Sequence, residues 1–333
     1  MNTGPLTGVS VVMPVLNEAK YLNQAVSEIL NQQVSVPIEV VLAVGPSTDE
    51  TALIAAELAA ADPRVVVVAN PSGKTPAALN LAIAKAKFEV IVRVDGHAIL
   101  TENYIQTAIT VLQETNADVV GGVMAAAGVS RFEVAVAAAM RSVLGVGPAS
   151  FHTGGGAGPA LTVYLGVFRR AALERVGGYN ESFIRAQDWE LNYRIRQSGG
   201  LIWFDPRLEV TYRPRSTIKA LAKQYFNYGK WRREVARTYP ETKSLRYLAP
   251  PLTLLALLSS AGLLITSYFL GAGFYLIFLV PIAGYLSLIL AGSVLIFNKK
   301  HLSSLLWQPL VLLTMHMCWG AGFLTSPKNL RAR

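Results

Sequence analysis

Short apolar runs alternate with longer amphipathic stretches along the first part of the chain. The runs at 9–16, 38–44, 65–69 and 89–94 are rich in β-branched residues, and polar residues follow each of them. Most of them lead into a helix-like stretch of roughly ten to fifteen residues. Strands that alternate with helices predict an α/β domain with a mostly parallel sheet covered on both faces. A further strand is expected at 118–127.

The last part of the chain has a different pattern. Three long apolar stretches, at 251–270, 274–297 and 305–324, approach or exceed the roughly 20 residues that a membrane-crossing helix needs. We therefore expect the α/β domain at 1–245 and transmembrane helices within 246–333. The alternative is a set of buried core hairpins.

Positive charge is concentrated just before these apolar stretches. The chain has 333 residues and a formal net charge of +9, and eleven Lys/Arg against four Asp/Glu lie between Asp205 and Leu248. A basic segment at about 205–245 next to apolar helices predicts contact with an anionic membrane surface. Nucleic acid is the competing partner for a basic segment, but the neighbouring apolar stretches favour lipid and no nucleic acid.

Features near the two ends of the sequence predict the cellular compartment of the N-terminal domain. The first eight residues lack a basic start and an apolar segment, so no signal peptide is expected and the N-terminal domain is predicted to face the cytosol. The single cysteine, Cys318, excludes an intrachain disulfide and agrees with a reducing compartment. Three crossings would place Lys328 and Arg331 outside, against the positive-inside tendency. Either one apolar stretch is re-entrant or interfacial, or the short tail violates the rule.

Ligands of a parallel α/β sheet bind at the carboxyl ends of its strands. The residues to inspect are therefore those at 14–18, 45–51, 73–75 and 95–97. These and three downstream motifs form a recognisable series. The series is Pro14-Val15-Leu16-Asn17-Glu18, Ser47-Thr48-Asp49-Glu50-Thr51, Gly73-Lys74, Asp95-Gly96-His97, Gln187-Asp188-Trp189-Glu190, and Arg213-Pro214-Arg215.

In sequence and spacing the series resembles the family 2 glycosyltransferases over about residues 9–235. Asp95-Gly96-His97 together with Arg213-Pro214-Arg215 is similar to the succinoglycan-type exopolysaccharide branch of that family. The resemblance implies a GT-A (Rossmann-like) catalytic domain that transfers a sugar from a nucleotide-diphosphate donor.

Asp95 and His97 are the candidate metal ligands. They lie two residues apart directly after an apolar strand, so their side chains project to the same side. Carboxylate and imidazole can hold Mn²⁺ or Mg²⁺, which would neutralise charge on a leaving diphosphate. The resemblance makes this the family's metal-binding position, with His97 replacing a second Asp, a change that favours Mn²⁺. The alternative is a turn in which Asp95 bonds backbone amides.

Asp188 is the candidate catalytic base, at the start of a helix expected to run through Gln197. An inverting transfer needs one carboxylate to accept the proton of the attacking hydroxyl, and the resemblance gives Asp188 that role. The alternative is an acid stabilised by the helix dipole. Trp189 and Glu190 are candidate acceptor contacts, and Glu190 is alternatively a supporting residue.

The loop Pro14, Asn17 and Glu18 is expected to hold the nucleotide, although Asn17 or Glu18 equally suits a helix cap. Asp49 matches the family's nucleoside-binding acid. Ser47 and Glu50 have the spacing of a capping box. Many relatives carry another carboxylate before this serine, where this chain has glycine and proline, which leaves the base of the donor open.

Three basic side chains are candidate contacts for phosphate. Lys74 precedes a helix expected at 75–86, whose N-terminus adds backbone donors. Arg213 and Arg215 would clamp either the donor diphosphate or the lipid phosphate of the acceptor, or would contact lipid headgroups instead. Gln224 matches a Gln-x-x-Arg-Trp motif of processive relatives, but Arg and Trp are missing at the matching offsets. A single transfer per acceptor is therefore expected.

Together these features predict a multi-pass enzyme of the cytoplasmic membrane with its catalytic domain in the cytosol. The reaction expected is an inverting, metal-dependent transfer of one sugar to a lipid-linked or polyprenyl-linked acceptor. The alternatives are direct transfer to polyprenyl phosphate and a non-catalytic subunit of a polysaccharide assembly complex.

Overall fold

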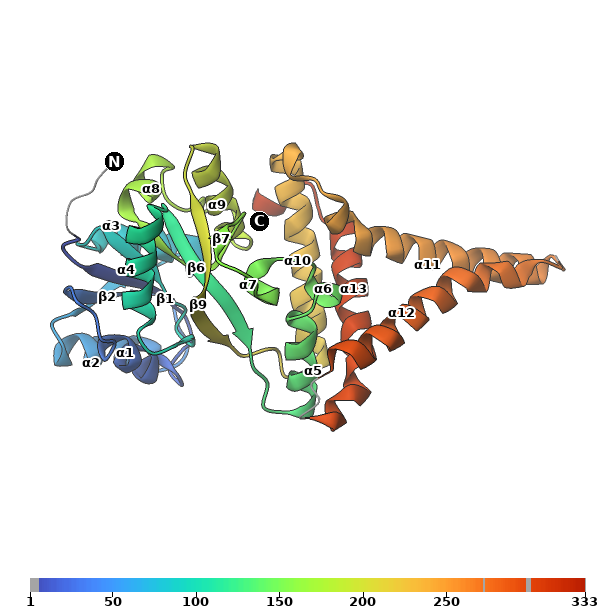
Figure 1. Ribbon diagram of the computed structural model, residues 1–333, viewed down its shortest axis with the longest axis horizontal. Coiled ribbons are helices and arrows are strands. Elements are labelled where there is room, and N and C mark those ends of the chain that lie inside the picture. Colours follow the sequence, from blue (N-terminus) through green and yellow to red (C-terminus); the bar gives the residue numbers. More distant parts are fainter. Residues whose placement is uncertain (1–5, 272, 298–300, 333) are drawn as a thin grey trace. The chain divides into compact units, whose positions relative to one another are not determined.

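The computed structural model describes residues 6–271, 273–297 and 301–332 of the chain. Its contacts divide the chain into two compact units (Figure 1). The α/β unit comprises 1–125 and 150–212, and the helical unit comprises 126–149 and 213–333.

The α/β unit is built on a nine-stranded mixed sheet of order β3-β2-β1-β4-β8-β6-β9-β5, with β7 paired to β9. Its strands are β1 (Val9–Val15), β2 (Ile38–Val44), β3 (Val65–Ala69), β4 (Val90–Arg93), β5 (Ile99–Leu100), β6 (Val119–Ala126), β7 (Gly158–Pro159), β8 (Tyr164–Arg169) and β9 (Ile202–Tyr212). The first four are parallel, whereas β8 runs antiparallel to both β4 and β6. The expected strands all form, within a residue or two of the predicted limits.

Helices cover both faces of this sheet, as predicted (Figure 1). They are α1 (Leu22–Leu30), α2 (Thr51–Ala61), α3 (Thr75–Lys85), α4 (Tyr104–Thr115), α7 (Ser150–Thr153), α8 (Arg170–Arg175) and α9 (Gln187–Gln197). One face packs against α1, α2 and α4. The other packs against α3, α8 and α9. Because alternate strand residues enter opposite cores, Val92 belongs to the first core and Ile91 to the second.

The helical unit contains α5 (Arg131–Met140), α6 (Val143–Val146), α10 (Ile218–Thr238), α11 (Leu245–Phe269), α12 (Val280–Ile296) and α13 (Gln308–Leu324). Four short 3₁₀ turns complete its described elements, at Pro240–Thr242, Tyr275–Leu279, Leu302–Trp307 and Leu330–Ala332. The capping box that begins α5 is complete, with Ser130 and Glu133 each bonded to the backbone of the other.

The helices α10 and α13 pack backbone to backbone. A side chain at Gly229 of α10 would overlap the carbonyl of Trp319, and one at Gly322 of α13 would overlap the carbonyl of Phe226. Arg233 donates hydrogen bonds to the carbonyls of Phe323 and Leu324, at 2.8 and 2.7 Å, and so caps the C-terminal end of α13. The apolar stretch 305–324 is therefore covered along one side by a helix.

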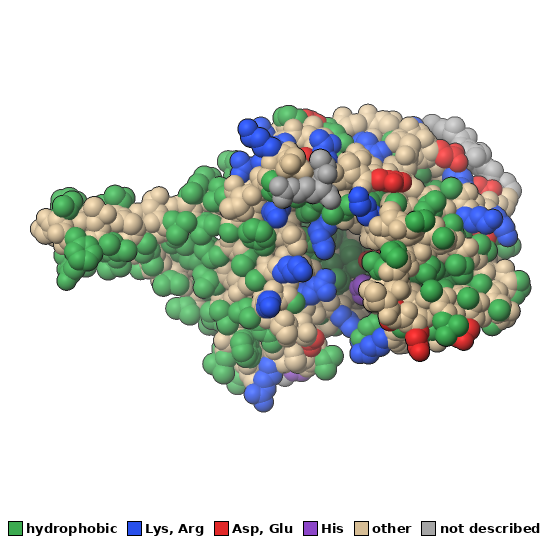
Figure 2. All heavy atoms as spheres, turned by 180° about the vertical axis from the view of Figure 1, so that it is seen from behind, with side chains coloured by type: hydrophobic (Ala, Val, Ile, Leu, Met, Phe, Trp, Pro, Cys, Tyr) green, Lys and Arg blue, Asp and Glu red, His purple; other side chains and the backbone are tan. Residues whose placement is uncertain are grey.

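Two of the three predicted spans are found among the described residues. The helix α11 and the segment Tyr275–Ile296 are long and apolar enough to cross a membrane, and they are only 11% and 17% buried. They lie side by side as a hairpin, and apolar side chains cover the face of it drawn in Figure 2. The third predicted span, at 305–324, stays a prediction: its helix α13 packs on α10, which carries six Lys/Arg.

The division between the two units also differs from the boundary predicted near residue 245. Residues 126–149 and 213–245 belong with the helical unit. The reason lies in contacts that sequence periodicity does not report. The α10 side chain of Arg237 bonds the carbonyls of Ser326 and Pro327, and Gln308 of α13 donates to the carbonyl of Ala135 in α5, at 3.1 Å.

Candidate active site

The centre of the candidate site is the carboxyl end of β4. Residues 91, 93 and 95 alternate onto the face of the sheet that α9 covers, because Ile91 packs in one core with Leu191 of α9. Arg93 and Asp95 therefore point toward the helix that carries Asp188. The guanidinium of Arg93 is almost wholly buried, with 6% of its side chain exposed.

Arg93 joins the two acids predicted to perform the chemistry. Its Nη2 donates to Oδ1 of Asp95 at 3.0 Å, and its Nη1 donates to Oδ1 of Asp188 in a short contact. Burial by itself lowers the pKa of Arg93, but the charge of Asp95 raises it, and the pKa stays above its ordinary value. The fold thus brings together two carboxylates that lie on different elements, and one cation holds both.

Asp188 lies in the first turn of α9, where the helix dipole also favours a negative charge. Its side chain is 37% exposed, so it remains open to solvent while Arg93 holds one oxygen. The next residue, Trp189, stacks on Tyr193 with ring centroids 5.6 Å apart and planes within 9°. Glu190 is fully buried, and Arg194 binds its carboxylate through two contacts of 2.8 Å. This placement favours the supporting role for Glu190 over acceptor contact.

Glu18 lies beside His97 rather than in a helix cap. The carboxylate of Glu18 is 2.8 Å from Nδ1 of His97. Gly96 makes this approach possible, because a Cβ there would lie 2.9 Å from Cγ of Glu18. A carboxylate against one ring nitrogen is the arrangement that commonly orients a metal-ligating histidine through its other nitrogen.

The residues present fit a divalent cation that also takes ligands from its substrate. In the described part of the chain, no three His, Cys, Asp or Glu side chains gather closely enough to enclose a metal. Oδ2 of Asp95 accepts no hydrogen bond from the described residues, and 26% of this side chain is exposed. Asp95 and His97 would therefore supply protein ligands, and diphosphate oxygens would complete the coordination shell.

The two loops predicted to hold the nucleotide are fastened to each other. Asn17, at φ 56°, accepts a hydrogen bond from the amide of Thr48 at 2.8 Å and donates its own amide to Oγ of Ser47 at 3.1 Å. Asp49 accepts from the hydroxyl of Thr51 and the amide of Ala19, and the Thr51 hydroxyl is the main cause that lowers the pKa of Asp49.

The capping box predicted from Ser47 and Glu50 does not form, because Ser47 bonds the first loop and the N-cap residue of α2 is Glu50, which makes no side-chain cap. Pro14 lies within β1, opposite Ala43 of β2. Both loops thus meet at the same end of the sheet, next to Asp95.

Lys74 is the N-cap residue of α3, and Asn80 lies in the middle of that helix. Lys74 is exposed and precedes α3 with no capping contact of its side chain. Asn80 bonds the backbone of Tyr179 in both directions, at 2.8 and 2.9 Å, and so fixes the turn that contains Gly177 and Gly178. Tyr179 is 3% exposed, and burial raises its pKa to about 12.

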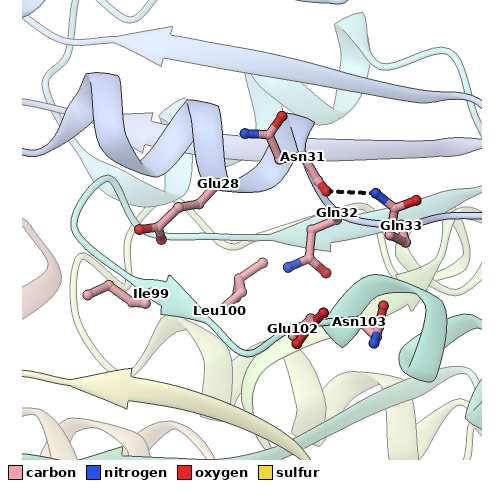
Figure 3. Close-up of a pocket in the computed structure, with 8 residues that line it drawn as sticks. All are labelled: Glu28, Asn31, Gln32, Gln33, Ile99, Leu100, Glu102 and Asn103. Carbon is pink, nitrogen blue, oxygen red and sulfur yellow. Dashed lines mark hydrogen bonds between the residues drawn. The ribbon is translucent and has the colours of Figure 1, made fainter.

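A cavity of about 370 Å³ lies elsewhere in the α/β unit, between the end of α1 and the loop before α4 (Figure 3). Gln32 lines it and bonds the backbone of Thr101 and Ile105. The cavity contains none of the residues predicted for the site, so these contacts hold the loop and do not mark a substrate pocket.

Three predicted residues belong to the helical unit. Arg213 and Arg215 precede α10, and Gln224 is buried within it, where it donates to the hydroxyl of Tyr228 at 2.8 Å. Their roles stay predictions.

Arg93 is the residue that sequence reasoning missed. It is a single charged residue at the end of the run Val90-Ile91-Val92. Its spacing of two residues from Asp95 is the one sequence feature that could have indicated their contact. Alternation places residues 93 and 95 on one face. The partner on α9 lies 95 residues away and has no local signal.

Comparisons with known proteins agree with this architecture. The model of the family "Glycosyl transferase family 2" matches residues 10–177. Succinoglycan biosynthesis protein ExoA of Rhizobium meliloti is 30% identical over 337 residues, which cover 100% of this chain and 99% of that protein. A dolichyl N-acetyl-alpha-D-glucosaminyl phosphate 3-beta-D-2,3-diacetamido-2,3-dideoxy-beta-D-glucuronosyltransferase of Methanococcus voltae is 24% identical over 66% of this chain and 71% of its own length.

Among solved structures, the mannosyltransferase PcManGT of Pyrobaculum calidifontis, in complex with GDP-Man and Mn²⁺, superposes with a TM-score of 0.60 at 20% identity. The match covers 94% of this chain and 86% of that one, and it confirms the predicted GT-A fold. Since the family model spans half of the sequence and the Rhizobium protein matches it from end to end, the chain belongs to glycosyl transferase family 2.

Proposed function

We propose that this glycosyltransferase transfers one sugar, with inversion, from a nucleotide-diphosphate donor to a lipid-linked glycan in polysaccharide synthesis. One observation carries the proposal: Arg93 contacts the carboxylates of both Asp95 and Asp188. A base for the acceptor hydroxyl and a carboxylate for the donor side thereby share one site, as a direct displacement requires.

Asp188 acts as the base. Its partly exposed carboxylate accepts the proton of the acceptor hydroxyl as that oxygen bonds to the anomeric carbon and the diphosphate leaves from the opposite face. The guanidinium of Arg93 and the first turn of α9 both favour the ionised form of Asp188.

Asp95 and His97 hold the divalent metal, Mn²⁺ or Mg²⁺, and Glu18 orients the His97 ring. When bound, the metal supplies positive charge that stabilises the leaving diphosphate. The structure of PcManGT with GDP-Man and Mn²⁺ supports a metal in this fold. Pro14, Asn17 and Asp49 shape the nucleoside site, and Lys74 contacts phosphate ahead of α3.

The acceptor is proposed to be lipid-linked. Trp189, stacked on Tyr193, offers an aromatic surface next to the base. The lipid phosphate and the acceptor glycan are proposed to contact Arg213, Arg215 and Gln224. Two observations support a lipid acceptor: the apolar hairpin of α11 and α12, and the dolichyl phosphate substrate in the name of the Methanococcus relative.

The enzyme is proposed to sit at the cytosolic face of the cell membrane, anchored by the hairpin. The basic helix α10 leads directly toward α11, where Lys and Arg would meet anionic headgroups. The name of the Rhizobium relative supports a role in exopolysaccharide synthesis.

The function is tested with the purified full-length chain in detergent. Labelled nucleotide sugars are first screened by thermal shift with and without Mn²⁺, and the donor is expected to stabilise only when metal is present. That donor is then incubated with membrane lipid extract or with bare polyprenyl phosphate. Transfer to extract only supports the proposal, whereas transfer to bare polyprenyl phosphate favours the lipid-phosphate sugar synthase.

The catalytic assignment has its own control in this assay. Asp188→Asn keeps the size of the side chain and removes the base, so at saturating Mn²⁺ turnover is expected to fall about 10²–10⁴-fold while the donor still binds. NMR of the product is expected to show an inverted anomeric centre. Full turnover in Asp188→Asn would contradict the assignment of Asp188 as the catalytic base.

A further inference from the structure

Arg93 joins two carboxylates while its own side chain is buried. Arg207 of the α/β unit also joins two carboxylates, those of Asp205 and Glu114, but 53% of its side chain is exposed. Arg169 and Arg170 also direct their guanidinium groups inward, but their bonds go to backbone carbonyls at Ala117, Leu112 and Phe88. Arg93 instead bonds two carboxylates with two different nitrogens, and Nε finds no partner among the described residues.

Burying the charged guanidinium of Arg93 costs hydration free energy. Removing a guanidinium from water is unfavourable unless ionised partners compensate the lost hydration. Both partners here are partly exposed, at 26% and 37% of the side chain, so neither acid is confined by burial. Arg93, Asp95 and Asp188 form a trio in which the buried guanidinium, at the end of β4, is the fixed member. The two more exposed carboxylates are positioned by their bonds to it.

The turn that carries Tyr179 is tied to two helices of the α/β unit. The charges of Arg93 and Asp95 shift the pKa of the buried Tyr179 in opposite directions, downward and upward respectively. The backbone of Tyr179 is bonded twice to Asn80 of α3. The turn before it is tied to α9, because Arg194 donates to the carbonyls of Val176 and Gly178 at 2.6 and 2.8 Å. The guanidinium thus stands where β4, α3 and α9 are linked.

We propose that Arg93 is a positioning residue that sets the separation between the base Asp188 and the donor-side carboxylate Asp95. This inference rests on the proposed function. Guanidinium presents planar donors in fixed directions, whereas an ammonium is a single point charge, so lysine cannot bond both acids in the same geometry. The consequence is that acceptor and donor ends of the site are aligned before substrates arrive.

The test uses the full-length enzyme in detergent with saturating Mn²⁺. Arg93→Lys keeps the charge and is expected to lower kcat by about 10²-fold, the effect of a misplacement of about 1 Å, with KM for the donor changed far less. In Arg93→Ala, added guanidinium ion is expected to restore part of the lost turnover. Arg170→Ala is the matched control, since it removes an inward guanidinium that bonds only carbonyls, and guanidinium is expected not to rescue it.

A second measurement leaves Arg93 in place, in case its variants do not fold. In Asp188→Asn, Arg93 loses one ionised partner and binds Asp95 more tightly, so Mn²⁺ affinity measured by electron paramagnetic resonance is expected to fall about fivefold or more. Glu174→Gln, on α8, removes an acid outside the trio and is expected to leave Mn²⁺ affinity unchanged.

The outcomes separate this inference from the proposed function. A folded Arg93→Lys enzyme with wild-type kcat, equal guanidinium rescue of Arg170→Ala, or unchanged Mn²⁺ affinity in Asp188→Asn overturns the positioning role. If instead the wild-type enzyme transfers no sugar while Mn²⁺ affinity still responds to Asp188→Asn, the linkage stands and the proposed reaction fails.

Discussion

Arg331 of the C-terminal tail forms an ion pair with Glu234 of α10, with Nε 2.9 Å from Oε1. Glu234 precedes the apolar hairpin and Arg331 follows α13, so both ends of the intervening segment meet. An odd number of membrane crossings would place these two residues on opposite faces. In a chain whose hairpin crosses a membrane, their contact, with α13 packed along α10, would require an even number of crossings, which agrees with the positive-inside tendency.

The first prediction concerns this topology. Cys318→Ser provides a cysteine-free background, in which single cysteines are introduced at Gly273 and at Asn329, which is exposed. In sealed vesicles, a membrane-impermeant maleimide is expected to label position 329 from the side that carries the α/β unit and position 273 from the opposite side only. Labelling of position 329 from the far side would mean an odd number of crossings.

The second prediction concerns Glu18 and metal affinity. Glu18→Gln weakens the acceptor that faces Nδ1 of His97, so Mn²⁺ affinity is expected to fall about 10–100-fold, as for other outer-shell carboxylates. Mn²⁺ binding is read by electron paramagnetic resonance. Glu50→Gln is the matched control, because Glu50 is an exposed acid in the neighbouring loop without a capping bond. Equal Mn²⁺ affinities of the two variants would show that Glu18 does not contribute to metal binding.

The third prediction separates backbone strain from contact at the turn before Tyr179. Gly177 and Gly178 have φ values of 73° and 71°, but only a Cβ at Gly178 would meet a neighbour, at 2.7 Å from Oδ1 of Asn80. Either alanine variant is expected to lose about 1–3 kcal/mol of stability from the left-handed backbone. Gly178→Ala is expected to lose more and also to lower kcat, because it displaces Asn80. Thermal melts and turnover of the two variants make the comparison, and equal effects would contradict it.

The fourth prediction concerns pH and His152. Burial lowers the pKa of His152 to about 4, and its Nδ1 finds no hydrogen-bond partner among the described residues. The unfolded chain binds a proton near pH 6.5 and the folded chain does not until near pH 4. The stability contribution of neutral His152 is thus complete above pH 6.5 and is lost as the pH falls toward 4.

The melting temperature of the wild-type chain is accordingly expected to drop by a few degrees more than that of His152→Gln between pH 7 and pH 5. Melts of both proteins by circular dichroism across this range provide the measurement. Parallel curves would mean that His152 is protonated without cost in the folded state.

The fold was largely predictable from local pattern. Strands such as β1 and β2 are buried on both faces, so their β-branched runs are visible without any tertiary information. The carboxyl-end rule then placed Asp95, Glu18 and Asp49 near one another before any contact was known. Asp188 required the family resemblance, because the first turn of a helix is an ordinary place for an acid.

Two features escaped prediction for related physical reasons. The third apolar stretch matches a membrane span in composition, but α10 packs closely against it at Gly229 and Gly322, and hydropathy does not distinguish a neighbouring helix from lipid. In the sequence Arg93 looks like an ordinary charged residue at the end of a strand. Its second carboxylate partner, Asp188, is supplied only by the packing of α9 on the sheet. In both cases the deciding neighbour lies far along the chain.

The sequence between the two halves of the hairpin is leucine, glycine, alanine, glycine and phenylalanine, at positions 270–274. No ionisable group therefore has to pass through the bilayer interior when this segment inserts, which spares about 2.5–3.5 kcal/mol for each charged side chain avoided. The hairpin is in this respect suited to enter the membrane from one side after synthesis, with no folded or charged loop to translocate. Its anchoring would then depend on lipid partitioning of the two helices alone.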